Sequence, residues 1–295
     1  YSMIWQIHRL DRMDRKLDML MQQQQGDRGT APALEARIAE LEQRLAGMGA
    51  AQQPGVEVVP WGEYLFGFPA TEWRLAAYVK HRNHPEPGTL RAIQNYLREG
   101  MGYVDIGASF GLLTVPAAGS VGEKGYVQAW EPDPLSYSIL SGNVQLNNLL
   151  GNRTVELLPY AAGARDGRGM LFSNASSRTY STLGPGDEGE WTGTGVEVRR
   201  LDEQLRGRTA DILKIDAEGH EPAVLEGAAG ALRSGQIKVM IVEFAPGILQ
   251  RSGRDAAAWL ERLRGMSAGL AEIDESTGDL MEADNGTLLN RASTN

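Results

Sequence analysis

The sequence of 295 residues contains no cysteine. This absence excludes disulfides, thiolate nucleophiles, cysteine-ligated zinc and iron–sulfur clusters. Long apolar runs are also missing: stretches such as Val239–Val242 have the length of a strand, whereas a membrane helix needs ~20 apolar residues. The first residues alternate charged with apolar side chains, so we expect neither a secretory leader nor a membrane span. The default expectation is therefore a cytoplasmic protein.

Positive charge is scarce as well. The chain has 29 basic and 38 acidic residues and a formal net charge of −9, and only five of the basic residues are lysines. Sequence-independent binding to a nucleic-acid backbone needs the opposite balance. Hydrophobic residues make up 42% and charged residues 23%, which is ordinary for a globular protein and excludes a disordered chain. We expect a small-molecule or protein partner and no nucleic acid.

Residues 1–50 follow heptad patterns that the rest of the chain lacks. Two frames that do not join carry apolar residues at heptad spacing: Met3, Ile7, Leu10, Leu17 and Met21, then Leu34, Ile38, Leu41, Leu45 and Met48. We predict helices that self-associate as a coiled coil, which makes a homo-oligomer through residues 1–50. Arg37 and Glu42, at g and e positions of the second frame, favour a parallel dimer or trimer. The alternative is a pair of amphipathic helices that pack on their own domain.

Residues 51–100 are predicted to be a linker followed by lead-in elements. Pro54, Gly55 and Pro60 indicate the linker, Tyr64–Pro69 an edge strand, and Thr71–His81 and Thr89–Glu99 two helices. His81 and His84 are three residues apart, a spacing that a metal could use. No further ligand lies nearby and Pro85-Glu86-Pro87 breaks any helix there, so we assign no metal to this pair.

Residues 101–295 alternate short buried strands with helices, which is typical of a parallel α/β sheet. The predicted core strands are Tyr103–Ile106, Tyr126–Trp130, Val155–Leu158, Ile212–Ile215 and Lys238–Val242. Two further predictions concern the segments beside them: a hairpin that pairs Met170–Phe172 with Gly195–Arg199, and an antiparallel pair formed by Leu270–Ile273 and Thr287–Leu289. Trp259–Leu263 is predicted to be helical.

The sharpest local motif is Tyr103–Gly111 (YVDIGASFG). A buried strand runs directly into two glycines four residues apart, and a helix-like apolar stretch follows. Glycines let a backbone approach a nucleotide-like ligand, and the start of a helix offers unpaired N–H groups. The alternative is a glycine turn needed only for contact between the strand and the helix.

Acidic residues follow four of the predicted strands. Asp105 and Glu131 belong to the first two, and Asp216 and Glu243 to the last two. The carboxyl edge of an open α/β sheet is where ligands bind, and a carboxylate such as Glu131 can accept the hydroxyls of a ribose. Carboxylates also cap helices that follow strands, which is the plainer interpretation. Together with the glycine turn, the acids indicate an adenosine-binding edge.

The predicted strand Ile212–Ile215 runs into the motif Lys214–Pro222 (KIDAEGHEP). Pro222 can open the following helix, which places residues 218–221 in the turn above the sheet. Within this turn, His220 is a candidate general base because an imidazole titrates near neutral pH. The alternative is a histidine that only makes local hydrogen bonds at the start of the helix.

These motifs together resemble the FkbM-type S-adenosylmethionine-dependent methyltransferases over roughly residues 86–290. The matching blocks are Glu86-Pro87, Tyr103–Gly111, Glu131-Pro132, Ala161-Ala162, Val196–Leu205, Asp211–Gly227, Ile241–Phe244 and Gly286–Leu289. The resemblance implies a Rossmann-like, seven-stranded class I methyltransferase sheet with one antiparallel strand, here preceded by the helical extension. Two positions depart from the family: Ser109 stands where Asn is common, and Pro116 should kink or shorten the first helix.

The resemblance also implies roles for individual residues. The glycine turn approaches the methionine part of S-adenosyl-L-methionine, the acid after the second strand holds the ribose, and the position of Ala161 lies along the adenine. The cofactor-binding set is Asp105, Gly107, Ala108, Ser109, Gly111, Glu131, Ala161 and Asp216. The candidate catalytic bases are Asp216, Glu218 and His220. No resident metal is assigned, although an ion bridging Asp216 and Glu243 is the alternative way to acidify an acceptor hydroxyl.

The function expected from this resemblance is O-methylation of a sugar, a glycan or a related small molecule. Two other classes stay open: a non-catalytic scaffold that uses the methyltransferase fold and assembles through its N-terminal helices, and a nicotinamide-dependent oxidoreductase. Release of S-adenosylhomocysteine that depends on an acceptor would separate the first class from the second. The sequence names neither the acceptor nor the hydroxyl that is methylated.

Overall fold

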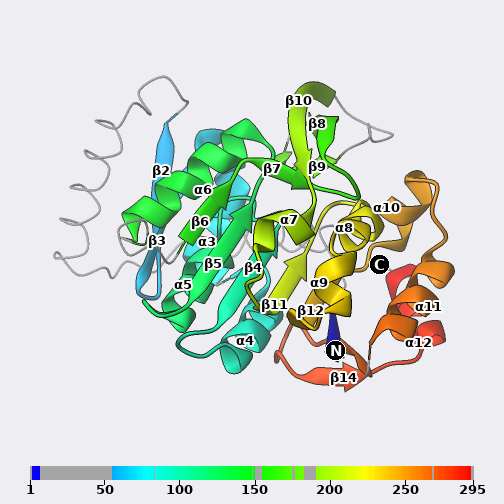
Figure 1. Cartoon of the computed structure of the whole chain (residues 1–295). Coiled ribbons are helices and arrows are strands. Elements are labelled where there is room, and N and C mark those ends of the chain that lie inside the picture. The colour runs from blue at the N-terminus through cyan, green and yellow to red at the C-terminus, as the bar shows by residue number, and fades with distance from the viewer. Residues whose placement is uncertain are drawn as a thin grey trace.

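The computed structural model describes residues 2–6, 55–82, 84–147, 149, 155–174, 177–182, 191–267 and 269–293. Within these ranges the chain forms a mixed α/β fold around a central, mostly parallel sheet (Figure 1). The predicted heptad region from residue 7 to residue 50 lies outside the described residues, so the predicted coiled coil remains a prediction.

Eight of the described strands form the main sheet, in the order β14-β13-β1-β12-β11-β4-β5-β6. Their bounds are β1 Ser2–Gln6, β4 Gly102–Ile106, β5 Tyr126–Trp130, β6 Val155–Leu158, β11 Ala210–Ile215, β12 Ile237–Glu243, β13 Gly269–Ile273 and β14 Leu280–Glu282. Neighbouring strands are parallel except for β13 and β14, which are antiparallel. The five predicted core strands are confirmed as β4, β5, β6, β11 and β12.

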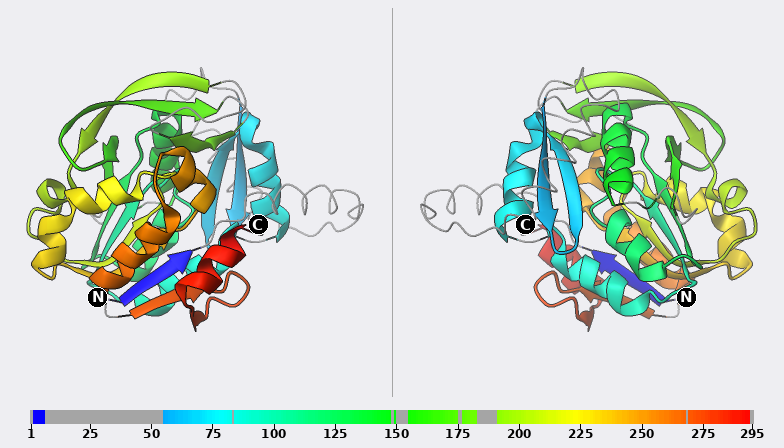
Figure 2. Two further views of the ribbon diagram at one scale, coloured as in Figure 1. Left: turned by 90° about the vertical axis from the view of Figure 1, so that its right-hand side faces the viewer. Right: turned by 90° about the vertical axis from the view of Figure 1, so that its left-hand side faces the viewer.

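The N-terminal strand β1 corrects two predictions. Ser2–Gln6 lies parallel to both β12 and β13, with Ile4 opposite Ile241 on one side and Ala271 on the other. The helix predicted from Met3 onward is therefore wrong over these five residues. The predicted count of seven strands is wrong too, because β1 is inserted and the sheet has eight. Figure 2 shows β1, in blue, beside the orange elements from the other end of the chain.

Helices cover both faces of the main sheet. On one face lie α4 Pro87–Tyr96, α5 Thr114–Val121 and α6 Pro134–Leu146, whose core also includes residues of α3 Trp73–Arg82, a helix that packs on strands β2 and β3. On the other lie α7 Leu201–Leu205, α8 Glu221–Gly227, α9 Ala229–Arg233, α10 Pro246–Arg251, α11 Ala256–Met266 and α12 Asn285–Ser293. Alternate residues of each strand contribute to the two cores, as β4 shows: Tyr103 packs in the first and Val104 in the second. None of the helices described combines the length and apolar character that crossing a membrane requires.

A second sheet starts directly after the carboxyl end of β6. Its order is β7-β10-β8-β9, and the bounds are β7 Tyr160–Ala162, β8 Gly167–Asn174, β9 Ser177–Thr182 and β10 Trp191–Arg199. The predicted antiparallel association of Met170–Phe172 with Gly195–Arg199 is confirmed, because β8 and β10 pair antiparallel and Met170 faces Gly195, but Leu171 and Phe172 face Thr194 and Gly193. In Figure 1 this sheet lies at the top, beyond the ends of the main strands.

The lead-in region is a hairpin followed by two helices. Its strands are β2 Val56–Trp61 and β3 Tyr64–Pro69, which pair antiparallel, and the short 3-10 helix η2 Ala70–Glu72 leads into α3. The predicted linker at Pro60 is therefore wrong, because Val56–Trp61 is a strand. Pro60 is tolerated there since a two-stranded hairpin has edges on which no N–H is needed.

Candidate active site

Four adjacent parallel strands bring the predicted acids to one edge of the main sheet. The order β12-β11-β4-β5 places Glu243, Asp216, Asp105 and Glu131 at the carboxyl ends of neighbouring strands. Their exposed fractions are 6% or less for Asp105, Glu131 and Glu243, so three of the four are buried. The expected gathering of acids at this edge is what the strand order produces.

Lys214, which the sequence analysis did not assign to the site, lies at its centre. Its side chain is 4% exposed, and its Nζ donates a hydrogen bond to the carbonyl oxygen of Gly107 at 2.9 Å. The same ammonium lies 3.4 Å from Asp105 Oδ1 and 3.5 Å from Asp216 Oδ2. Because Lys214 and Asp105 face each other on β11 and β4, one buried cation connects the glycine loop (residues 107–113) with the acid turn (residues 216–221).

Burial and charge act in opposite directions on this group. Burial alone lowers the pKa of Lys214, but the carboxylates of Asp216, Asp105 and Glu86 outweigh it and raise the pKa above its ordinary value. Burial also raises the pKa of Asp105, against the ammonium of Lys214 and a 2.6 Å hydrogen bond from Thr114 Oγ1. Lys214 is therefore protonated at neutral pH.

The glycine loop has a left-handed backbone at three positions. Gly107, Ser109 and Gly111 have φ values of +75°, +49° and +83°. A Cβ added to Gly107 would lie 1.9 Å from the carbonyl oxygen of Asp216. Glycine is thus required at this position by close contact with the backbone that follows the neighbouring strand β11, a packing reason that the sequence did not indicate. Ala108, 5% exposed, is also buried, and its N–H donates to Trp130 O at 2.9 Å.

Glu131 binds the glycine loop directly. Its Oε2 accepts the N–H of Ser109 and its Oε1 that of Asp133, both at 2.8 Å. Burial raises the pKa of Glu131 to about 7, although the two backbone hydrogen bonds oppose this shift. The acid after β5 therefore stabilises the left-handed residue Ser109, a role that the sequence did not indicate.

The acid turn is organised by Glu221. Its Oε1 accepts the N–H groups of Ala217 and Gly219, each at 3.0 Å, and Glu218 between them has a left-handed φ of +50°. Burial raises the pKa of Glu221 to about 7. The helix α8 begins at Glu221 with Pro222 in its first turn, as predicted.

Glu243 lies behind this turn and is 3% exposed. Burial raises its pKa well above the ordinary value, and the charges of Asp216, Glu218 and Glu221 and a hydrogen bond with Asp216 add to the shift. Glu243 therefore keeps its proton to a higher pH than an ordinary glutamate does. Asp216 is thus contacted by Glu243 at the end of the neighbouring strand β12 and by Lys214 of β11, the strand that Asp216 follows.

His220 has different neighbours from Asp216. Burial lowers the pKa of His220 and the charge of Arg254 lowers it further, against the charge of Glu226. A Cβ added to Gly163, just after β7, would lie 3.8 Å from the Nε2 of His220. The imidazole is therefore neutral at neutral pH and faces the start of the second sheet.

Ala161 lies in β7 and not in the main sheet. It is 6% exposed and packs with Leu171 and Val196 in a small core of the second sheet. Its neighbour Tyr160 meets Trp130 of β5 edge-on, with ring centroids 6.4 Å apart. This contact connects the second sheet to the strand that precedes Glu131.

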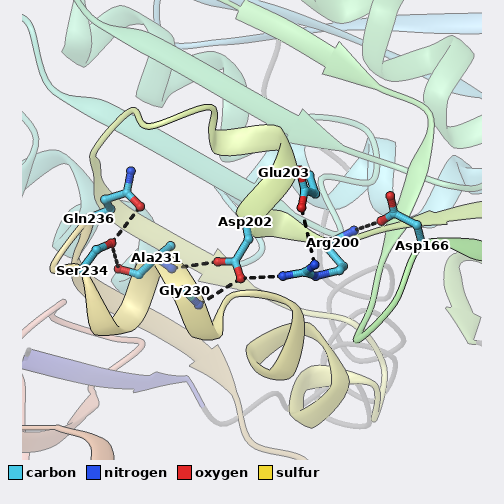
Figure 3. A network of polar contacts seen from close by, with 8 residues as sticks. All are labelled: Asp166, Arg200, Asp202, Glu203, Gly230, Ala231, Ser234 and Gln236. Carbon is cyan, nitrogen blue, oxygen red and sulfur yellow. Dashed lines mark hydrogen bonds and ion pairs between the residues drawn. The ribbon is translucent and has the colours of Figure 1, made fainter.

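A second polar network holds the elements that border the acid turn (Figure 3). Asp202 of α7 accepts the N–H groups of Gly230 and Ala231 at the start of α9, at 2.9 and 2.7 Å, and pairs with Arg200 at 3.0 Å. Asp166 accepts the backbone N–H of Arg200 at 2.7 Å. The Val196–Leu205 block therefore fixes the second sheet to α9.

Within the described ranges, no group of three or more His, Asp or Glu side chains is placed to hold a metal ion. His84, one of the two histidines at metal-like spacing, uses both ring nitrogens in hydrogen bonds to the backbone.

Sequence reasoning missed Lys214, Glu221 and also Asn143 of α6, whose Nδ2 donates to the carbonyl oxygen of Phe110 in the glycine loop at 2.8 Å. Lys214 offered a signal, because a lysine inside an apolar strand must find a buried partner and lysines are rare in this chain. The partners of Glu221 and Asn143 depend on loop geometry that no spacing displays.

A parallel sheet with an acid-lined carboxyl edge and a glycine loop after its first central strand is typical of nucleotide-binding α/β proteins. Comparison with known families narrows this class: the family model "Methyltransferase FkbM domain" matches residues 105–268. The chain belongs to the FkbM methyltransferase family, as the sequence resemblance predicted.

Solved structures show similar chains at low identity. The methyltransferase FkbM from Methylobacillus flagellatus KT is 17% identical with a TM-score of 0.40, and covers 79% of this chain and 53% of its own. A putative rRNA-methylase from Clostridium thermocellum is 12% identical with a TM-score of 0.32, over 48% of this chain and 58% of its own. A putative O-methyltransferase from Klebsiella pneumoniae is 17% identical with a TM-score of 0.28, over 77% and 69%.

At these TM-scores the likenesses carry no weight for function, and the family assignment rests on the family model. The first two similar structures are matched over little more than half of their own length. The search of curated proteins finds no match.

Proposed function

We propose that this protein transfers the methyl group of S-adenosyl-L-methionine to a hydroxyl of a sugar, a glycan or a related small molecule. The observation that carries the proposal is Lys214, which joins the glycine loop at Gly107 to Asp216 of the acid turn. In a member of the FkbM family, this ion pair connects the two segments between which cofactor and acceptor would meet.

The residues at this edge fit the cofactor. S-adenosylmethionine carries a sulfonium, an ammonium and ribose hydroxyls. Glu131 uses one position on each carboxylate oxygen for a backbone N–H, and each oxygen can accept a second hydrogen. Asp105, Glu131 and Asp216 supply more negative charge than Lys214 neutralises, which suits a cation. Glu131 would hold the ribose, and Asp105 and Asp216 would face the methionine part.

Bound S-adenosylmethionine supplies an electrophilic methyl group on sulfur. The chain must orient the acceptor hydroxyl in line with that methyl and remove its proton. Among Asp216, Glu218 and His220, we favour His220 as the base, because its neutral imidazole has a nitrogen without a proton that can accept one. Asp216, held by Lys214 and Glu243, is better suited to orienting the hydroxyl.

The binding test compares Glu131→Gln with Glu156→Gln. The first removes the charge that accepts the ribose hydroxyls but keeps one oxygen for the loop. The second removes a carboxylate of β6 that pairs with Arg208 at 2.7 Å, away from the glycine loop. Titration calorimetry should show affinity for S-adenosylmethionine falling ~10-fold in Glu131→Gln only. Equal affinities in both variants would remove the cofactor assignment.

The catalytic test compares His220→Gln with Asp216→Asn in a panel of glycans and small hydroxylated acceptors. Release of S-adenosylhomocysteine should fall ~10²–10⁴-fold in His220→Gln, with cofactor affinity unchanged. Full activity in His220→Gln and loss in Asp216→Asn would move the base to Asp216. A wild-type chain that binds no cofactor and releases no product would favour the scaffold alternative.

The proposal also includes where the acceptor binds, where the protein is located and how it assembles. We place the acceptor against the second sheet, residues 160–199, because that sheet begins at the carboxyl edge and His220 faces Gly163. A cytoplasmic location and a homo-oligomer through residues 1–50 complete the proposal.

A further inference from the structure

The first turn of α5 leaves one carbonyl of the glycine loop without a helical donor. The carbonyl oxygen of Gly111 accepts the N–H of Val115, four residues on, at 2.9 Å. The corresponding donor for Leu112 would be residue 116, which is Pro116 and has no N–H. The proline that departs from the family pattern thus removes a hydrogen bond at the loop.

His84 occupies the place of the missing donor. Its Nε2 lies 3.0 Å from the carbonyl oxygen of Leu112, and the N–H of Glu86 donates to its Nδ1 at 3.0 Å. A carbonyl oxygen only accepts and an N–H only donates, so the ring is the neutral tautomer with its proton on Nε2. Burial lowers the pKa of His84, which is 2% exposed, although the charge of Glu86 and the two backbone hydrogen bonds oppose the shift.

The imidazole is held in this orientation by the lead-in hairpin. Trp61 of β2 meets the ring of His84 edge-on at a centroid distance of 5.5 Å. Two residues beyond Leu112, Thr114 donates to Asp105 at 2.6 Å. A displacement of Leu112 would therefore be transmitted to the carboxylate beside Lys214.

We propose that His84 is a positioning residue that replaces the N–H absent from Pro116 and holds the glycine loop in the conformation that binds S-adenosylmethionine. The inference rests on the proposed function for its ligand. It assigns to the lead-in segment a direct part in the cofactor site.

Two substitutions separate the two hydrogen bonds of the ring. His84→Gln places an amide near the position of Nε2, where it can donate to Leu112. His84→Asn places an amide near the position of Nδ1, where it can accept from Glu86 but cannot reach Leu112. By calorimetry on the full chain, we expect affinity for S-adenosylmethionine to fall ~5–20-fold in His84→Asn and less than ~3-fold in His84→Gln.

The decisive experiment combines these variants with Pro116→Ala, which restores an N–H at residue 116. In that background, His84→Asn should change affinity by less than ~2-fold, because Leu112 has a second donor. Equal losses in both backgrounds, or equal losses in the Asn and Gln variants, would overturn the inference. Asn147→Ala is the control, since Asn147 holds β3 through Leu65 and makes no hydrogen bond to the loop.

Amide hydrogen exchange of residues 108–115 without ligand gives an independent measurement. Exchange should accelerate in His84→Asn and slow again when Pro116→Ala is added. If the wild-type chain binds no S-adenosylmethionine, the proposed function fails, and this exchange pattern still decides whether His84 replaces the missing donor. Unchanged exchange in His84→Asn would contradict it.

Discussion

Asn143 of α6 donates a hydrogen bond from Nδ2 to the carbonyl oxygen of Phe110 at 2.8 Å. The same side chain accepts the N–H of Gly67 at 2.6 Å and donates to its carbonyl oxygen at 3.2 Å. One turn later, Asn147 binds Leu65 in the same manner, at 3.0 and 2.8 Å. Two side-chain amides thus act as a partner strand for β3, and one of them also fixes the glycine loop.

We expect Asn143→Ala to lower the free energy of unfolding by about 2–4 kcal/mol, since it leaves buried backbone groups of Gly67 and Phe110 without partners. Asn147→Ala, at a less buried position, should cost about 1–2 kcal/mol. Urea denaturation of both variants measures the difference. A larger loss in Asn147→Ala would contradict the central position of Asn143.

Lys214→Met removes the ammonium between Asp105 and Asp216. Breaking a buried ion pair on one side leaves uncompensated carboxylates, so we expect a loss of about 3–5 kcal/mol in the free energy of unfolding at neutral pH. Lys238→Met, the same change at an exposed position of the neighbouring strand β12, should cost under about 0.5 kcal/mol. Similar denaturation midpoints for the two variants would rule out a central role for Lys214.

The raised pKa of Glu243 predicts how stability depends on pH. The folded protein keeps a proton on Glu243 where an unfolded glutamate, with its ordinary value of 4.5, has lost it. The folded state therefore binds more protons than the unfolded state above about pH 4.5, and stability falls as pH rises from there through the raised pKa. Glu131 and Glu221, each raised to about 7, act in the same direction.

Glu243→Gln keeps a hydrogen-bonding side chain of the same shape without a titrating proton. Relative to the wild type, the melting temperature of Glu243→Gln should rise as the pH increases from about 5 to about 8. In this range unfolding of the wild type releases the proton of Glu243, which favours the unfolded state as pH rises, and the variant has no such proton. Scanning calorimetry at several pH values gives the comparison. A difference independent of pH would show that Glu243 is already ionised in the folded state.

Ser109 has a left-handed backbone at φ +49°, and the family resemblance has Asn at this position. Asn adopts this conformation more readily than Ser, so Ser109→Asn should stabilise the protein by about 0.5 kcal/mol. Ser109→Val should destabilise it by about 1 kcal/mol or more, because a β-branched residue is strained there. The melting temperatures of the two variants test the left-handed conformation of Ser109. A Ser109→Val variant more stable than the wild type would contradict it.

Strand β1 changes how the predicted assembly is best tested. Removal of residues 1–50 would also remove Ser2–Gln6 from the sheet, so a smaller particle would not isolate the heptads. Leu41→Asp should lower the oligomeric state in light scattering and leave the sheet intact. Ile4→Pro should destabilise the fold by about 3 kcal/mol, because a proline in a strand with a neighbour on each side removes a ladder hydrogen bond, while Ile4→Val should not.

The core of the main sheet was predictable because its strands are short, apolar and followed by turn residues. The predicted bounds of Tyr126–Trp130 and Val155–Leu158 coincide with β5 and β6. A short apolar run that no turn residues bound is ambiguous between helix and strand. Ser2–Gln6 is such a run, and pairing with distant strands decides its conformation.

Near the other end of the chain, one strand predicted from the sequence is a helix. Thr287–Leu289 was predicted to pair antiparallel with Leu270–Ile273, whose actual antiparallel partner is β14. Thr287 lies instead in α12, where Asp284 accepts its N–H at 2.8 Å as a helix cap. The Asp-x-x-Thr spacing before an apolar pair is a capping signal that outweighs β-propensity here.

Within the site, the sequence predicted the carboxyl edge of the sheet and its acidic residues but not the separate role of each residue. Glu131 was predicted to serve a ligand, and the structure shows that it also holds Ser109 in place. Two carboxylates that read alike in sequence, Glu218 and Glu221, differ in their places in the turn: Glu221 accepts the N–H groups of Ala217 and Gly219 at 3.0 Å, whereas Glu218 has a left-handed backbone at φ +50°. Such roles depend on backbone geometry, which spacing alone does not encode.

The position of β1 has a consequence for synthesis of the chain. Its partners, Val239–Glu243 and Gly269–Glu272, leave the ribosome only when most of the polypeptide has been made. Until then Ser2–Gln6 has no strand to join, and its own unpaired N–H and C=O groups could pair with other molecules. Closure of the sheet is therefore a late event of high contact order, and we expect refolding yield to depend on protein concentration more strongly than in a sheet completed from neighbouring segments.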